Sequence, residues 1–141
     1  MGLDFVRIQK PARKLRKLLK KMPADPGPED VHDFRTQSRQ LEANLQAFRL
    51  DSGRVGRRIL QPISRLRKRA GKVRDMDVLT GFASRVPAQD GEQECSIRLL
   101  EYLGARRDKY ARKFHAAAAI AQSFASASKR ASENSPGLKR A

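Results

Sequence analysis

The side chains best suited to chemistry in this sequence are its arginines and lysines, and the chemistry they suit is the binding of phosphate groups. The chain holds 31 Lys and Arg against 15 Asp and Glu, a formal net charge of +16 over 141 residues. A guanidinium offers phosphate two parallel hydrogen bonds, whereas a lysine ammonium acts as a mobile point charge. No Asp or Glu occurs in 5–24 or 52–74, so these stretches lack the i, i+4 ion pairs that stabilise an isolated helix. Such charge predicts a polyanionic partner.

The cationic residues recur at helical spacing on arcs that border the apolar stripes. At about 100° per residue, each stripe spans roughly 60° to 80°. A charged helix face is often only a solvated face, but stripes that border the core can converge on one surface, and this is the interpretation that we adopt. The residues predicted on this ground to bind the anion are Lys14, Lys17 and Lys21; His32, Arg35 and Arg39; Arg58, Arg65, Arg69 and Lys72; and Arg106, Lys109 and Lys113.

Proline and glycine divide the chain into four segments that must position these side chains. Breaks fall at 23–28, 51–53 and 87–91, and apolar residues between them recur every three or four positions, as in amphipathic helices. We expect helices at 3–22, 29–50, 55–85 and 92–127, with a kink or a helix start at Pro62. Short connections favour an all-α, antiparallel four-helix bundle.

The expected core is built from one stripe on each of the last three helices. The stripes are Val31, Phe34, Ser38, Leu41, Leu45 and Phe48; Ile59, Ile63, Leu66, Ala70 and Val73; and Leu99, Leu103, Tyr110, Phe114, Ala117, Ala121 and Phe124. The end of the chain is rich in Ser, Ala, Lys and Arg and lacks an apolar stripe, which predicts disorder. We therefore expect one bundle at 1–127 and a low-complexity basic C-terminal tail at 128–141.

The residues that catalysis or metal binding would need are missing or badly spaced. Cys95 is the only cysteine, which excludes an internal disulfide and disfavours a thiolate metal site. Asp75 and Asp77 are two apart and point to nearly opposite sides of a helix, so they cannot chelate one ion. They suit the orientation of basic neighbours or the capping of the helix near Thr80-Gly81. There is no glycine-rich phosphate loop. We expect no enzymatic activity, no metal and no cofactor, and a cytoplasmic protein without a membrane span or secretory signal.

Two motifs resemble those of the CHAD family, the conserved histidine α-helical domain. Val31-His32-Asp33-Phe34-Arg35, followed by Arg39, is similar to its V-H-x-x-R-x-x-x-R helix. The run from Ala70 to Leu79, AGKVRDMDVL, resembles its L-G-x-v-R-D-x-D-V signature. The order and spacing of the two motifs also match the family pattern.

The resemblance implies a basic concave surface that binds inorganic polyphosphate, association with polyphosphate granules, and no enzymatic activity. It adds Arg74 to the predicted ligand residues, although an ion pair with an acidic neighbour is an equal alternative for this side chain. Glu42 departs from the family pattern, which is more basic there, and brings a negative charge near the expected site.

Full-length members of the family have two four-helix bundles, and this chain has room for one. A homodimer could rebuild the pair, one bundle could suffice, or the chain could be a degenerate remnant. The alternative function is non-specific nucleic-acid binding in the manner of a nucleoid protein, since a charge of +16 would bind any polyphosphodiester. A third hypothesis is an accessory domain detached from a phosphohydrolase or a triphosphate-processing enzyme, because the family occurs fused to such domains.

Overall fold

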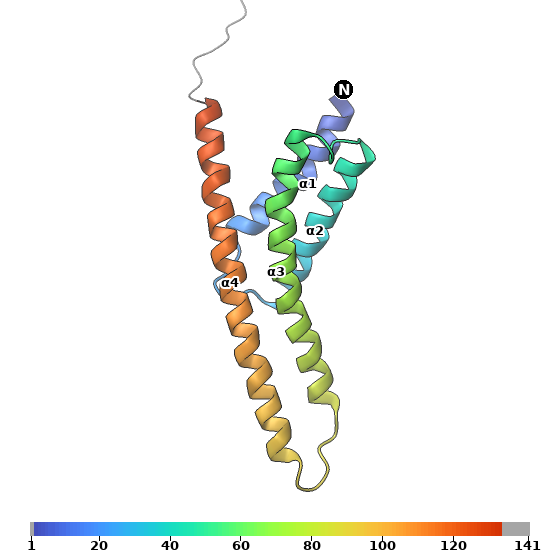
Figure 1. Ribbon diagram of the computed structural model, residues 1–141, viewed down its shortest axis with the longest axis vertical. Coiled ribbons are helices and arrows are strands. Elements are labelled where there is room, and N and C mark those ends of the chain that lie inside the picture. Colours follow the sequence, from blue (N-terminus) through green and yellow to red (C-terminus); the bar gives the residue numbers. More distant parts are fainter. Residues whose placement is uncertain (1, 134–141) are drawn as a thin grey trace, which may run out of the picture.

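Four helices run antiparallel to their neighbours along the chain and form a bundle (Figure 1). The computed structural model describes residues 2–133, with side chains for 7–54 and 56–123. The helices are α1 (Gly2–Lys20), α2 (Pro28–Ala47), α3 (Arg54–Arg85) and α4 (Gln93–Glu133). None of these helices is long and apolar enough to cross a membrane. The sequence-based expectation of an all-α bundle is confirmed.

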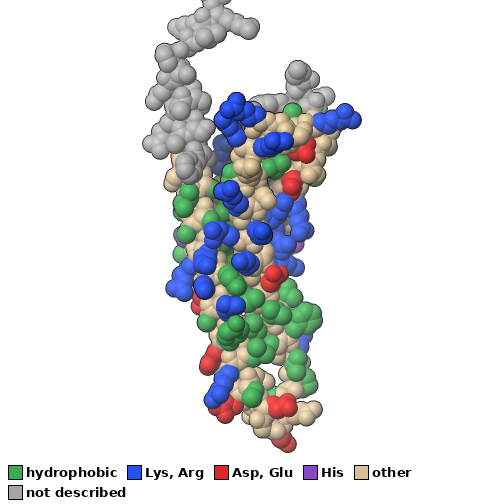
Figure 2. Space-filling model, in the orientation of Figure 1, with side chains coloured by type: hydrophobic (Ala, Val, Ile, Leu, Met, Phe, Trp, Pro, Cys, Tyr) green, Lys and Arg blue, Asp and Glu red, His purple; other side chains and the backbone are tan. Residues whose placement is uncertain are grey.

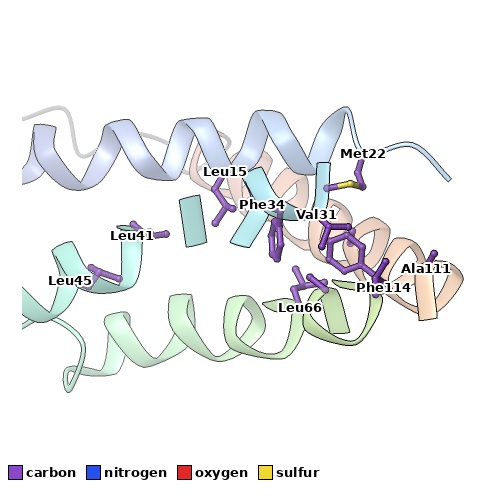
Figure 3. Packing of buried hydrophobic residues seen from close by; sticks show 12 residues of the cluster. Leu15, Met22, Val31, Phe34, Leu41, Leu45, Leu66, Ala111 and Phe114 are labelled. Carbon is purple, nitrogen blue, oxygen red and sulfur yellow. The ribbon is translucent and has the colours of Figure 1, made fainter. Parts of the chain in front are cut away.

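The helices pack in a ring, in which α1 contacts α2 and α4, and α3 contacts α2 and α4. Helix α1 therefore lies diagonally opposite α3. The core fills the centre of this ring, where the rings of Phe34 and Phe114 meet with their centroids 5.2 Å apart (Figure 3). Ser38 is also buried, and its hydroxyl donates to the carbonyl of Arg35 at 2.9 Å. The predicted α2 stripe is thus correct from Val31 to Leu45.

Helix α2 has well-defined ends. Gly27 is its N-cap and donates its N–H to the carboxylate of Asp30 at 2.9 Å, while Pro28 occupies the first turn, where a missing N–H costs nothing. At the other end Arg49 adopts φ 56°. The N–H groups of Arg49 and Leu50 return to the carbonyls of Gln46 and Leu45, which makes a Schellman turn with arginine in the position that glycine prefers.

Helix α3 is continuous through Pro62, so the cationic stripe on either side of this proline stays in register. A Cβ on Gly56 would lie 1.7 Å from the carbonyl oxygen of Leu50. The turn from α2 therefore passes directly over the first turn of α3, and glycine permits this close approach.

The α3–α4 hairpin extends past the bundle. Helices α1 and α2 cover only part of its length (Figure 1), and none of residues 78–102, which we call the hairpin tip, is buried. The prediction that Leu99 lies in the core is therefore wrong, since its side chain is 48% exposed. Ile59, near the other end of α3, is also exposed.

The C-terminal boundary also differs from the sequence-based expectation. Helix α4 continues to Glu133, whereas we expected it to end at 127. Residues 128–133 of the predicted C-terminal tail are thus helical. The remaining part of that tail, 134–141, lies outside the described residues.

Candidate functional site

The first basic groove runs between α3 and α4 and has a volume of about 730 Å³. We call it the α3/α4 groove. It is lined by five cationic residues, Arg65, Lys68, Arg69, Lys72 and Lys113, over apolar residues that include Leu66 and Tyr110. Among the described residues no carboxylate lines it. These cations therefore face one another without an internal counter-charge.

Tyrosine rings on α4 help to fix cations beside this groove. The ammonium of Lys72 lies 5.5 Å from the ring centroid of Tyr110, and the guanidinium of Arg106 lies 5.8 Å from the same centroid. Arg106 is also 5.5 Å from the ring of Tyr102. Cation–π contacts at such distances are favourable, so the two long side chains lose part of their freedom before any ligand binds.

The second basic groove lies on the other side of α3, against α2, and has a volume of about 530 Å³. We call it the α2/α3 groove. Its lining consists of Arg35, Arg39, Ser64, Arg67, Lys68, Gly71, Lys72 and Asp75. Lys68 and Lys72 line both grooves, so the two grooves adjoin each other along α3.

Arg35 is held in an unfavourable electrostatic environment. Burial lowers the pKa of its guanidinium, and the positive charges of Arg39 and Arg74 lower this pKa further. Arg67 acts in the same direction, while Asp75 opposes it. The Nε of Arg35 is buried and has no hydrogen-bond partner among the described residues. A bound anion would supply both the missing partner and the missing negative charge.

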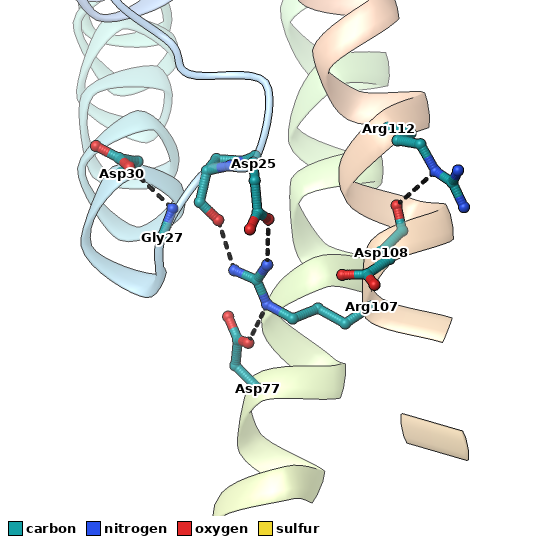
Figure 4. Close-up of polar contacts among 8 residues, drawn as sticks. Asp25, Gly27, Asp30, Asp77, Arg107, Asp108 and Arg112 are labelled. Atoms are coloured by element: carbon teal, nitrogen blue, oxygen red, sulfur yellow. Dashed lines mark hydrogen bonds and ion pairs between the residues drawn. The ribbon is translucent and has the colours of Figure 1, made fainter. Parts of the chain in front are cut away.

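Two carboxylates act on neighbouring arginines in different ways. Glu42 pairs with Arg67 at 2.5 Å, so the expected negative charge near the site does lie at the edge of the α2/α3 groove. Asp77 accepts a hydrogen bond from Nε of Arg107 at 2.6 Å (Figure 4). It therefore orients a basic neighbour, as the sequence suggested. Among the described residues no group of three acidic, histidine or cysteine side chains could hold a metal ion.

Arg107 connects three segments of the chain. Besides Asp77 on α3, it donates to the carboxylate of Asp25 at 2.9 Å and to the carbonyl of Pro26 at 2.5 Å. Burial lowers the pKa of Arg107, but the hydrogen bonds and charges of Asp77 and Asp25 outweigh burial and leave that pKa raised. The positive charge of Arg107 is thus already balanced by carboxylates of the protein, and its guanidinium is not available to an external anion.

The structure gathers part of the predicted set into the two grooves. Arg35 and Arg39 from α2, Arg65, Arg69 and Lys72 from α3, and Lys113 from α4 line them. Arg106 lies beside the α3/α4 groove, where it contacts Tyr110. Arg74 is near enough to the α2/α3 groove for its charge to lower the pKa of Arg35. His32, Arg58 and Lys109 are exposed and line neither groove.

The stripe on α1 does not join this surface. Lys14, Lys17 and Lys21 are exposed, but they belong to the helix and loop that stand diagonally opposite α3, and they line neither groove. The cations of three helices, and not of all four, therefore converge.

Sequence reasoning missed Lys68 and Arg67. Both fall outside the narrow arc that was assigned to the α3 stripe, yet Lys68 lines both grooves and Arg67 lines one. The signal that could have found them is the acid-free run 52–74, in which cations occur on every exposed side of the helix. When a helix is flanked by two grooves, the cations that line them are spread over a wider arc of its circumference than a single stripe.

The basic surface carries both motifs that resembled the CHAD family. Residues 8–133 match the family model described as the CHAD domain. The chain belongs to the CHAD domain family. No curated protein and no solved structure matches it. The α2 motif supplies Arg35 and Arg39, and the α3 motif supplies Lys72, Arg74 and Asp75, so the family signatures meet at the α2/α3 groove.

Proposed function

We propose that this CHAD domain binds inorganic polyphosphate across the α3/α4 and α2/α3 grooves and catalyses no reaction itself. The observation that carries the proposal is the acid-free lining of the α3/α4 groove, where five cations face one another. The unpartnered Nε of Arg35 supports it from the second groove. CHAD domains are associated with polyphosphate binding in general. On this proposal the protein would co-localise with polyphosphate granules in the cell.

A polymer suits this surface better than a single phosphate group. The cations are distributed over two grooves that share Lys68 and Lys72, so no single phosphate could contact more than a few of them. Successive phosphates of one chain bind at high effective concentration once the first is held. A long linear polyanion can therefore neutralise the whole surface.

Competition with duplex DNA tests polyphosphate against the nucleic-acid alternative. Labelled long-chain polyphosphate is bound at about 0.15 M salt, where exposed charges more than about 8 Å apart are largely screened. Duplex DNA and single-stranded RNA are then added at equal phosphate concentration. We expect neither to displace the label appreciably. Displacement by DNA would favour non-specific binding through counterion release.

Charge-reversal variants test whether the two grooves form an organised site. Arg69→Glu in the α3/α4 groove and Arg39→Glu in the α2/α3 groove each remove a charged contact worth about 1.5–3 kcal/mol, so we expect affinity losses of roughly tenfold to a hundredfold. The matched control is Arg16→Glu, an equal change of charge on an exposed residue of α1. Titration calorimetry or fluorescence anisotropy measures the three affinities. Equal losses in all three would mean that only net charge matters.

A further inference from the structure

The hairpin tip, residues 78–102, exposes more apolar surface than a solvated end requires. Seven large apolar side chains there are between 42% and 65% exposed: Val78, Leu79, Phe82, Val86, Ile97, Leu99 and Tyr102. Figure 2 shows hydrophobic side chains gathered below the Lys and Arg side chains, over the part of α3 and α4 that the other helices leave uncovered. At about 100° per residue Ile97 projects from the opposite side of α4 to Leu99 and Tyr102, so the patch consists of the four residues on α3 and at its C-cap with Leu99 and Tyr102. Exposed apolar patches of this kind mark interaction surfaces.

The charge of the tip differs from that of the remaining chain. It contains four carboxylates, Asp90, Glu92, Glu94 and Glu101, against two arginines, Arg85 and Arg98. One arginine, Arg98, is paired with Glu94 at 2.7 Å. The other 116 residues hold 29 Lys and Arg against 11 Asp and Glu. A copy of this chain thus offers both an acidic, apolar tip and the basic body that such a tip would prefer.

We propose that the hairpin tip is a dimer interface, in which the tips of two copies pack antiparallel about a two-fold axis through the apolar patch. Asp77 lies opposite Arg107 and Lys72 opposite Tyr110, so Phe82 lies at the level of about residue 101. An axis at this level buries the patch of each copy against the same patch of its partner, which is the isologous contact that closes a dimer.

Charge decides between the two ways of pairing the tips. From Glu101 to Glu92 the chain runs about 14 Å along the helix, and in the other direction Lys109 lies about 12 Å and Lys113 about 18 Å from Glu101. In the antiparallel pair Glu92 and Glu94 of each tip therefore stand at the level of Lys109 of the partner's α4, while Glu101 stands at the level of the partner's Glu101. A parallel pair would place carboxylates beside carboxylates and the two basic bodies beside each other, which is repulsive. This inference does not depend on the nature of the ligand in the grooves.

The mass of the chain in solution tests the interface. Sedimentation equilibrium is measured on protein freed of bound polyanion by anion exchange and checked for phosphate, since a bridging ligand would also join two copies. We expect twice the chain mass of 15.9 kDa at tens of micromolar. Phe82→Asp with Leu99→Asp should give a folded monomer, because both side chains are exposed in the single chain. The control is Leu50→Asp, also exposed but at the α2–α3 turn; this variant should remain dimeric.

Cross-linking tests the orientation. Cys95 is exposed and lies six residues from the axis, so in the antiparallel pair the two thiols stand about 18 Å apart along the helices, beyond the reach of a disulfide. In the double variant Cys95→Ser, Tyr102→Cys the thiols stand near the axis, and a short bifunctional thiol reagent should join the copies much faster than it joins the wild type. A monomeric wild-type chain, higher oligomers, or faster cross-linking through Cys95 would overturn the proposal.

Discussion

Two arginines show how the same side chain serves stability in one place and binding in another. Arg107 is 17% exposed and has two carboxylates and a carbonyl as partners. Arg35 has positive neighbours and an unpartnered Nε. In the free protein the guanidinium of Arg107 already has its hydrogen-bond partners and counter-charges, whereas that of Arg35 still lacks an anionic partner. Their pKa values are accordingly displaced in opposite directions.

Removal of Arg107 should destabilise the fold. Arg107→Gln removes the charged partner of the half-buried Asp77, and we expect a loss of about 2 kcal/mol in the free energy of unfolding, as for other hydrogen bonds to charged groups. Because the folded-state pKa of Arg107 is raised, its contribution is fully present at neutral pH and is lost only when the pH rises through that alkaline value. Urea denaturation at pH 7 measures the loss. Arg112→Gln, a change at an exposed arginine of the same helix, should cost much less, and an equal cost would contradict this account.

At the scale of helices, Pro11 creates a gap that another helix fills. Proline has no N–H to donate to the carbonyl four residues earlier, which here belongs to Arg7. The side chain of Asn44 on α2 donates to this same carbonyl at 3.1 Å. The proline in α1 therefore becomes a point of attachment to α2.

A double-mutant cycle tests this compensation. Asn44→Ala should lower the free energy of unfolding by about 1 kcal/mol in the wild-type chain. In a Pro11→Ala background the N–H of residue 11 can bond to Arg7, so the same change should cost close to nothing. Thermal or urea unfolding of the four proteins gives the coupling energy. Additive costs would show that Asn44 does not act on the carbonyl that Pro11 leaves free.

The Schellman turn after α2 predicts a gain in stability. Arg49 has φ 56°, a conformation that is strained for residues with a Cβ and free of strain for glycine. Arg49→Gly should therefore stabilise the protein by roughly 0.5–1 kcal/mol after the entropy of the unfolded glycine is counted. Arg49→Ala keeps the strain while it removes the charge, and it should be close to neutral. If alanine stabilises as much as glycine, charge and not backbone strain is the cause.

For the whole molecule, the sequence predicts the helices well, but it predicts poorly how far along each helix its neighbours cover it. Proline and glycine clusters locate the three breaks, and the apolar period selects the buried face, as at Phe34 and Phe114. Periodicity does not reveal where along a helix its neighbours stop. Leu99 continues the apolar stripe of α4, but it lies on the part of the hairpin that no other helix covers.

The same limit explains which site residues could be predicted. Arg65, Arg69 and Lys72 follow from spacing along one helix, and all three line the α3/α4 groove. The pairing of Arg67 with Glu42 depends on how α2 packs against α3, and the separation of the α1 lysines from this surface depends on which helices stand diagonally. Both are properties of the assembled ring, which no single helix encodes.

The sharing of Lys68 and Lys72 between the grooves has a consequence for the path of any thread-like ligand. These residues are one helical turn apart, about 6 Å, on the ridge that separates the two hollows. A polymer that occupies both grooves must cross α3 over these two lysines, so its path is transverse to the helix axes. The number of ligand monomers bound at once is then set by the width of the bundle, and longer helices would not increase it.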